Sequence, residues 1–245
     1  MRYHCLVLAL GICLSATAQQ KLTPAQNTIE KKWIQDETYS IKWLAMRDTT
    51  SIEIGTIKTI IQADKKARRL YITQQIQMKQ QQPKGWVDST IVSLDNFAPV
   101  YHSSYNAQRD MVLRFDGNKV TGYYMLTGKT ADIVNDALTV ATFDSNVYPH
   151  LLRWLPLQNG YSATLPIYDY NQEKHGVVNA VVKNTEAINY TLPNGTVAKA
   201  WKLTVQDEIG APGATVYYYI DQQSRQLLNM DLDMGTRKMK MIRVY

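Results

Sequence analysis

Methionine and aspartate side chains crowd into the C-terminal stretch NMDLDMGTRKMKMIRVY, which covers residues 229–245. Thioether sulfur is a soft ligand that suits copper(I), and the alternate residues Met239 and Met241 would share one face of a strand. No histidine lies in the stretch to complete a copper site, whereas methionine and leucine commonly fill adaptable apolar faces. We therefore interpret the methionines as an apolar face and predict that the chain holds no metal and no cofactor.

The aspartates of the same stretch fit a hairpin better than a calcium site. Their spacing lacks the glycine at the sixth position and the closing glutamate of an EF-hand loop. If Gly235 and Thr236 form a two-residue loop, both aspartates face lysines, and each such pair contributes about 0.2–1 kcal/mol. The predicted cross-strand pairs are Met230 with Met241, Leu232 with Met239, Asp231 with Lys240 and Asp233 with Lys238.

Catalytic patterns are weak in this chain. Neither the G-x-S-x-G nucleophile turn nor the H-E-x-x-H zinc motif occurs. We interpret His102, His150 and His175 as surface or half-buried residues and predict no catalytic residue. Carboxylate pairs that hydrolyse glycosides leave no local signal, and Asp169, Asp221 and Asp233 are the acids to consider. A hydrolase with a dispersed site therefore stays as an alternative.

Short runs of Tyr, Thr, Val and Ile, separated by turn residues, dominate the chain from Glu37 onward. They predict an all-β fold, a strongly curved antiparallel meander that forms an open barrel or half-barrel. Two further turns are expected at Gly117-Asn118, which pairs Asp116 with Lys119, and at Asn194-Gly195, which pairs Leu192 with Val197. The strands are expected at 39–47, 52–63, 68–79, 85–93, 99–104, 111–115, 120–127, 162–169, 176–182, 187–192, 197–207, 215–221, 227–234 and 238–245.

One segment departs from the strand pattern. The stretch DSNVYPHLLRWL, residues 144–155, has apolar side chains at helical spacing and Pro149 in the first turn. It predicts a short helix that lies as a lid across a sheet face or an open end of the sheet. As a lid, Trp154 would serve ligand capture, so that Trp154→Asp would abolish capture and leave the strands folded.

The first eighteen residues, MRYHCLVLALGICLSATA, have the basic start, short apolar run and small residues of a secretory signal. Cleavage near Ala18 removes both cysteines and gives a periplasmic or secreted protein with no transmembrane segment. Residues 19–36 form a polar N-terminal segment that we expect to be loose at first, and residues 37–245 form a single antiparallel β domain. The net charge of +6 is scattered, which argues against a nucleic-acid partner.

The segments DSNVYPHLLRWLPLQNGYSATLPIYDY and TVYYYIDQQSRQLLNMDLDMG resemble the uncharacterised exported domain-of-unknown-function family 3108. The resemblance rests on Arg153, Leu155, Pro156 and Leu157, and on Tyr218, Tyr219, Ile220, Asp221, Arg225, Leu227 and Leu228. It implies a shape like the half-barrels of periplasmic lipoprotein carriers, in which a helical lid covers a concave apolar face. It implies a cell-envelope location, but no activity.

These observations predict a non-enzymatic envelope protein that binds a lipid, an acyl chain or another apolar ligand on a concave sheet. One short helix gives too little cover for the apolar face of so many strands. A packed structural module that docks to an envelope protein partner or a glycan is the first alternative. The expected ligand-binding residues are Leu151, Leu152 and Trp154 of the lid and Met230, Leu232, Met239 and Met241 of the last hairpin.

Overall fold

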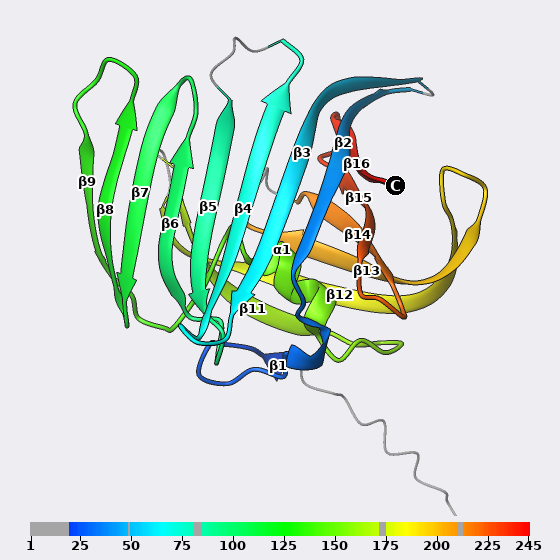
Figure 1. Cartoon of the computed structure of the whole chain (residues 1–245), viewed down its shortest axis with the longest axis horizontal. Coiled ribbons are helices and arrows are strands. Elements are labelled where there is room, and N and C mark those ends of the chain that lie inside the picture. The colour runs from blue at the N-terminus through cyan, green and yellow to red at the C-terminus, as the bar shows by residue number, and fades with distance from the viewer. Residues whose placement is uncertain (1–19, 49, 81–84, 172–174, 210–212) are drawn as a thin grey trace, which may run out of the picture.

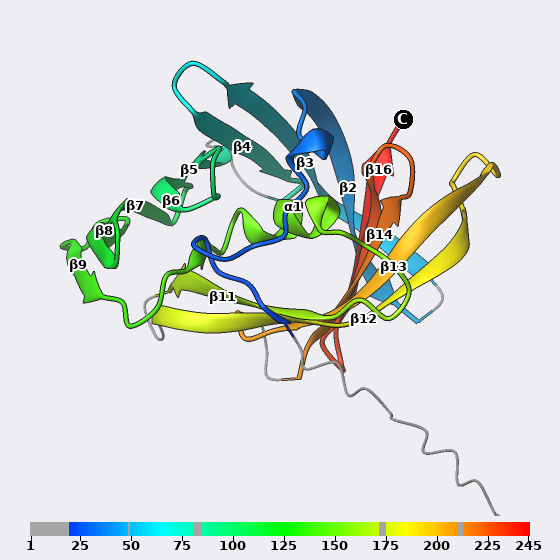
Figure 2. The same ribbon diagram turned by 90° about the horizontal axis from the view of Figure 1, so that it is seen from below.

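The strands of this protein form one continuous sheet that wraps around a short helix (Figures 1 and 2). The computed structural model describes residues 20–48, 50–80, 85–171, 175–209 and 213–245. The signal sequence expected at residues 1–18 lies outside this part of the chain. The predicted fold class, a curved antiparallel meander with one short helix and no closed barrel, is confirmed.

In the described part of the chain, sixteen strands make up the sheet. The first half contains β1 (Gln20–Lys21), β2 (Glu37–Arg47), β3 (Thr50–Asp64), β4 (Arg69–Met78), β5 (Trp86–Ser93), β6 (Pro99–Tyr105), β7 (Arg109–Asp116), β8 (Lys119–Leu126) and β9 (Asp132–Ala137). The second half contains β10 (Phe143–Asp144), β11 (Ala163–Tyr170), β12 (His175–Thr191), β13 (Val197–Asp207), β14 (Thr215–Asp221), β15 (Leu227–Asp233) and β16 (Lys238–Val244). The helical segments are η1 (Lys31–Trp33), α1 (Tyr148–Leu151) and η2 (Leu152–Trp154).

Neighbouring strands in the sheet follow the order β1-β11-β12-β13-β14-β15-β16-β2-β3-β4-β5-β6-β7-β8-β9, with β10 also paired to β11. The pairing of β16 with β2 joins the C-terminal meander to the N-terminal one. Side chains close the opposite side, where the Tyr168 hydroxyl donates to Asp136 Oδ2 at 2.6 Å and the Phe115 and Tyr168 rings meet edge to face. The sheet therefore surrounds an interior although its two ends share no strand pairing in the described residues.

The register of the last hairpin follows from its loop and its charge pattern. All four predicted cross-strand pairs of the stretch 229–245 are present. Met234 N–H donates to Arg237 O, and Gly235 has a φ of +75°, which a residue with a side chain adopts only with strain. The pair Asp116 with Lys119 at the Gly117 turn is confirmed as well.

Two expectations about strands are wrong. Val197 pairs with Thr191, not with Leu192, because a two-residue loop would give Pro193 a paired position that its missing N–H cannot fill. Instead Gly195 N–H donates to Leu192 O, with Pro193 at the second position of the turn and Gly195 at a φ of +85°. Residues 175–191 are also one strand with a bulge between Val182 and Asn184, not two strands.

The helix lies inside the sheet as an internal plug, so the expectation that it is a lid is wrong (Figure 2). The plug comprises α1 and η2, and every residue from Tyr148 to Trp154 except Pro149 is buried. Its hydrophobic residues Tyr148, Leu151, Leu152 and Trp154 belong to the main core cluster, in which Trp154 packs against Phe97. An apolar helix with this much buried surface on all sides must have protein around it.

The N-terminal segment is packed against the sheet, which corrects the expectation that it is loose. β1 pairs in parallel with β11, and Leu22 N–H donates to Thr164 O. Leu22 and Ile29 are buried in the main core, and Glu30 N–H donates to Trp154 O at 2.7 Å. These few apolar residues attach an otherwise polar segment to the sheet and to the plug.

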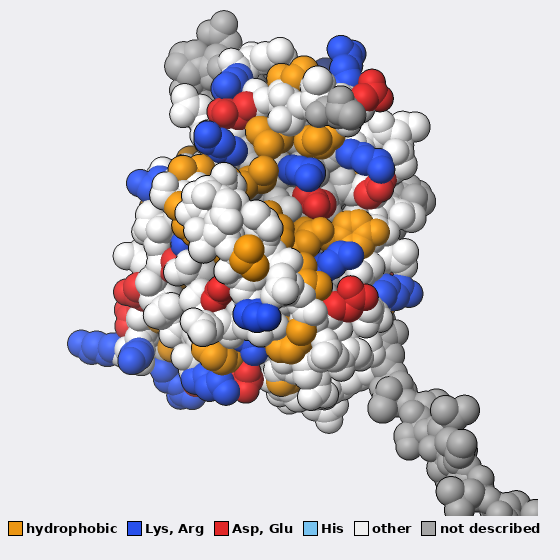
Figure 3. Space-filling view, turned by 90° about the vertical axis from the view of Figure 1, so that its right-hand side faces the viewer, with side chains coloured by type: hydrophobic (Ala, Val, Ile, Leu, Met, Phe, Trp, Pro, Cys, Tyr) orange, Lys and Arg blue, Asp and Glu red, His pale blue; other side chains and the backbone are white. Residues whose placement is uncertain are grey.

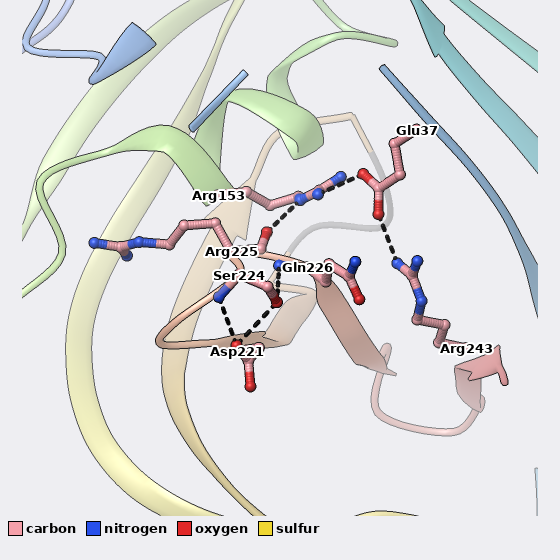
Figure 4. Close-up of polar contacts among 7 residues, drawn as sticks. All are labelled: Glu37, Arg153, Asp221, Ser224, Arg225, Gln226 and Arg243. Atoms are coloured by element: carbon pink, nitrogen blue, oxygen red, sulfur yellow. Dashed lines mark hydrogen bonds and ion pairs between the residues drawn. The ribbon is translucent and has the colours of Figure 1, made fainter. Parts of the chain in front are cut away.

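A buried charge network ties the plug to the sheet (Figure 4). Arg153 of η2 contacts Glu37 of β2 at 2.7 Å, and the other oxygen of Glu37 accepts from Arg243 of β16 at 2.9 Å. Arg153 Nε donates to the backbone oxygen of Arg225. Both guanidinium groups that contact Glu37 also lie over the ring of Tyr39. The single carboxylate of Glu37 therefore balances two buried cations.

We expect His150 of the plug to make the protein less stable in mild acid. Burial, with the nearby Arg153 charge, lowers the pKa of His150 to about 3. Below the ordinary histidine pKa of about 6.5, the unfolded chain binds a proton that the folded chain rejects. Stability should then fall by about 1.4 kcal/mol per pH unit as the pH drops from 6.5 toward 5.

Urea unfolding at a series of pH values measures this slope, and the variant His150→Gln should lack it. The other buried histidine, His102, has a raised pKa, so its stabilising charge is fully present below pH 6.5 and adds no slope there. Equal slopes for the variant and the wild type would contradict a neutral buried His150.

Candidate ligand-binding surface

Large apolar side chains form a row on the inner face of the sheet. Strand pairing places Met230 beside Met241, Met241 beside Trp43, and Trp43 beside Gly55, which faces Met78. The row crosses β15, β16, β2, β3 and β4 at one level, and Leu232 and Met239 form the next level of the same face. The Trp43 indole donates to Met239 Sδ at 3.2 Å, which links the two levels.

Exposure changes along this inner face. Toward the plug, the next level contains Arg243, Ile41, Ile57 and Ile76, and all four are buried. Trp43, Met78, Met230 and Met241 point to the same side but are only partly buried. Solvent therefore reaches the inner face at the level of Trp43, Met78, Met230 and Met241, which lies farther from the plug than the buried level. We call the partly exposed set the inner apolar surface; it comprises Trp43, Met78, Trp86, Met230, Leu232, Met239 and Met241.

Gly55 is the one small residue in the row, and its neighbours require it. A Cβ at this buried position would lie 2.7 Å from the backbone oxygen of Gln77 and 3.0 Å from Met78 Sδ. The close approach excludes a side chain without movement of the β4 backbone. Trp43 and Met78 therefore flank Gly55 with no side chain between them.

The four methionine and leucine residues predicted from the last hairpin lie together on this surface, whereas the three residues predicted from the lid do not. Leu151, Leu152 and Trp154 are buried in the core, so their side chains present no free face to a ligand in this structure. The sequence missed Trp43, Met78 and Trp86. A partial signal existed, because each lies at alternate spacing from buried residues of its own strand.

Polar groups adjoin the apolar surface on β5. Trp86 Nε1 donates to Asp88 Oδ1 at 2.7 Å and lies 3.2 Å from Ser104 Oγ. Alternation along β5 puts Trp86 and Asp88 on the inner face, and Gln74 of β4 pairs with Asp88. Trp86 and Gln74 are partly exposed, whereas Ile76, which lies between Met78 and Gln74 on β4, is buried, so Trp86 is the exposed side chain between the methionines and these polar groups.

Deeper on the same face, His102 and Asp144 form a buried pair. His102 Nδ1 lies 2.8 Å from Asp144 Oδ2, and Thr90 and the backbone of Asn146 donate to Asp144 Oδ1. Burial alone would lower the pKa of His102, but the charge and hydrogen bond of Asp144, together with the charge of Asp88, raise it. These contacts fasten β10 to β5 and β6.

The interpretation of the histidines as surface or half-buried residues is therefore wrong for His102 and His150, which are both buried. It holds for His175, which is exposed and stacks on Tyr170. In a strand sequence, a polar residue that alternates with hydrophobic neighbours is normally interpreted as solvent-facing. An inward-facing polar residue such as His102 gives the same pattern, and only its bonding partner in the structure, Asp144, distinguishes the two cases.

A hollow of about 270 Å³ lies beside β13 to β16 and shares Leu232 and Met239 with the inner apolar surface. Tyr217, Tyr219 and Lys202 border it on the outer face, where the Lys202 ammonium group lies 5.0 Å from the Tyr217 ring centroid. The Asp233–Lys238 ion pair and the Leu232 and Met239 side of the hairpin complete its rim. On the side of the molecule drawn in Figure 3, hydrophobic side chains lie between basic and acidic ones.

The geometry can now be compared with known proteins. The chain matches the family described as "Protein of unknown function (DUF3108)" over residues 38–242. This chain belongs to the DUF3108 family. No curated protein matches this DUF3108 chain significantly.

A solved structure has a fold similar to that of the DUF3108 chain. It is the crystal structure of a beta-barrel-like protein of the domain of unknown function DUF1849 from Brucella abortus. The two share 10% sequence identity with a TM-score of 0.57, and the match covers 88% of this chain and 97% of the other. At this identity the likeness concerns the barrel-like fold alone.

Two further observations bear on the site of the DUF3108 chain. The residues that the structure describes contain no group of three histidine, cysteine or acidic side chains placed to hold a metal ion. Within the same residues, no helix has the length and apolar character needed to cross a bilayer.

Proposed function

We propose that this DUF3108 protein is an exported, non-enzymatic protein of the cell envelope that binds an apolar or amphipathic ligand on its inner apolar surface. A lipid or an acyl chain is the expected ligand class. The observation that carries the proposal is the partial exposure of large apolar side chains on the inner face, at the level of Met230 and Met241 and at the level of Leu232 and Met239, while Ile41, Ile57 and Ile76 of the adjoining level are buried.

The side-chain types support this use of the surface. Burial of apolar surface yields about 25 cal/mol per Å², so water-exposed methionine and tryptophan side chains gain when a chain of methylene groups covers them. Methionine is flexible and polarisable and adapts to ligands of different shape. The plug closes the inner apolar surface at one end, because its buried residues pack in the same core as the adjoining level of the sheet.

The N-terminal sequence supports export. Residues 1–18 combine a basic start, a short apolar run and small residues before Ala18, which are the features that a signal peptidase recognises. The rest of the chain contains no cysteine, so folding in an oxidising compartment needs no disulfide. Detection of the mature N-terminus after expression in a bacterial periplasm tests this part.

Mass spectrometry of an organic extract from purified residues 19–245 tests the ligand. Phospholipid or fatty acid at close to one equivalent is the expected result. A protein that purifies without ligand and binds no added acyl chain would overturn the proposal and would favour the packed interaction module.

We expect Met241→Glu to reduce the retained lipid at least about tenfold, because a ligand over this position would bury an unpaired carboxylate. Ile242→Glu is the matched control. Ile242 is the next residue of β16, pairs with Lys42 and points to the outer face. Equal losses of lipid in the two variants would show that the inner face has no special part in binding.

A further inference from the structure

One carboxylate lies at the border of the inner apolar surface. Asp88 of β5 is 8% exposed, and its side chain faces inward beside Trp86. The Trp86 indole holds Oδ1 at 2.7 Å, which fixes the carboxylate in place. Among the residues that the structure describes, no hydrogen bond reaches Oδ2 of Asp88. The fixed carboxylate therefore has one oxygen left to accept a hydrogen bond from a ligand.

The cation nearest to Asp88 is already paired with another acid, although the charge of Asp88 helps to raise the pKa of His102. His102 on the neighbouring strand makes its ion pair with Asp144, and Asp169 adds a further acid on β11. Arg109 of β7 lies two strands away, where its guanidinium faces the Tyr124 ring and Met111 Sδ. No ion pair within 4.0 Å joins Asp88 to any cation of the described chain. A cation on the ligand would supply the missing partner.

Aromatic rings add to this preference. The indoles of Trp43 and Trp86 are partly exposed on the same inner face. The negative face of an aromatic ring attracts a cation, and tryptophan is the strongest partner. An ammonium group near Asp88 would meet a carboxylate and an indole, while its apolar chain covers the methionines.

We propose that the inner surface prefers an amphiphile with a positively charged ammonium group, which Asp88 binds, over neutral or acidic amphiphiles. This inference rests on the proposed function, because it assigns the polar end of the same ligand. The apolar end lies on Met78, Met230 and Met241, and the ammonium end lies against Asp88 and Trp86.

Three probes with the same twelve-carbon chain test the inference by isothermal titration calorimetry, each below its micelle concentration. They are dodecylammonium, dodecyl maltoside and dodecanoate. A charge-assisted hydrogen bond of about 1.5–3 kcal/mol predicts that dodecylammonium binds about ten- to a hundredfold more tightly than dodecyl maltoside. The chain has a net charge of +6, so general attraction would favour dodecanoate instead. A preference for the ammonium therefore reports a local site.

Asp88→Asn keeps the side-chain size and an oxygen that can accept from Trp86, and it should lower the affinity for dodecylammonium to about that for dodecyl maltoside. Asp110→Asn is the control, because Asp110 alternates with the inward-facing Met111 and causes the same change in net charge. If Asp88→Asn does not fold, the three affinities of the wild type still decide the question.

The outcomes separate the two proposals. Binding of no probe would overturn the proposed function itself. Equal binding of all three would support the proposed function and overturn the ammonium preference. A preference that persists in folded Asp88→Asn would overturn the assignment to Asp88.

Discussion

Replacing Trp154 by alanine is expected to lower the free energy of unfolding by about 3–5 kcal/mol. Trp154 is 1% exposed, and its ring lies 6.3 Å from that of Phe97 within the main core. Its indole Nε1 makes no hydrogen bond in the described structure. The loss therefore comes from buried apolar area and from the space left behind, which a plug surrounded by strands cannot close by moving. Urea unfolding followed by circular dichroism measures the change.

Trp43→Ala is the matched control for this prediction. Trp43 loses the same atoms but is partly exposed on the inner apolar surface, so its removal should cost clearly less stability. The two variants should also differ in ligand retention, because Trp43 belongs to the proposed binding surface. Unchanged stability of Trp154→Ala, with loss of ligand alone, would restore the lid interpretation. Trp154→Asp, in turn, is now expected to prevent folding, since it would bury a carboxylate without a partner.

The sequence predicts most strands and the register of the last hairpin for identifiable reasons. A two-residue loop fixes which residues face each other, and at Gly235 the aspartate–lysine pairs and the methionine–methionine pair agree on one register. Slipping by one residue would break all of these matches together. The strand residues next to the loop at Asn194 contain no pair of opposite charges that would test the register. The predicted register is wrong there because Pro193 widens the turn.

The position of the helical segment could not be predicted in the same way. Its apolar periodicity predicts that one face of the helix is buried against protein, but a lid and an internal plug have the same periodicity. The curvature of the sheet decides whether the helix becomes a lid or a plug. That curvature depends on the pairing of β16 with β2, two strands that are separated by most of the chain. β9 was missed because only Val134 among its six residues is buried, so its sequence reads as polar.

The polar interior was missed for a related reason. Asp88 and His102 alternate with other residues of their strands as solvent-facing residues do, and Asp144, the partner of His102, lies 42 positions away in the chain. The contact of Glu37 with Arg153 joins residues 116 positions apart, and its contact with Arg243 joins residues 206 positions apart. A single sequence contains no local pattern that pairs them.

Glu37→Gln is expected to destabilise the protein by about 3–5 kcal/mol. The side chains of Glu37 and Arg153 are 9% and 3% exposed, so water does not screen their charges. Removal of the carboxylate would leave Arg153 and Arg243 as two buried cations around the ring of Tyr39, with no acid between them. The neutral amide keeps the size of the side chain, so the loss reports charge and hydrogen bonding and not a cavity.

Glu53→Gln supplies the control for this effect, because it makes the same chemical change in an exposed ion pair. Glu53 and Lys79 lie 3.3 Å apart, but their side chains are 28% and 58% exposed, and such pairs contribute about 0–1 kcal/mol. Thermal and urea unfolding of both variants gives the comparison. The triple change Glu37→Gln, Arg153→Met and Arg243→Met should recover part of the lost stability, since it removes the two unpaired buried cations together with the carboxylate. A Glu37→Gln variant as stable as Glu53→Gln would mean that the two arginines do not depend on this carboxylate, and that the apolar contacts of the plug alone hold it within the sheet.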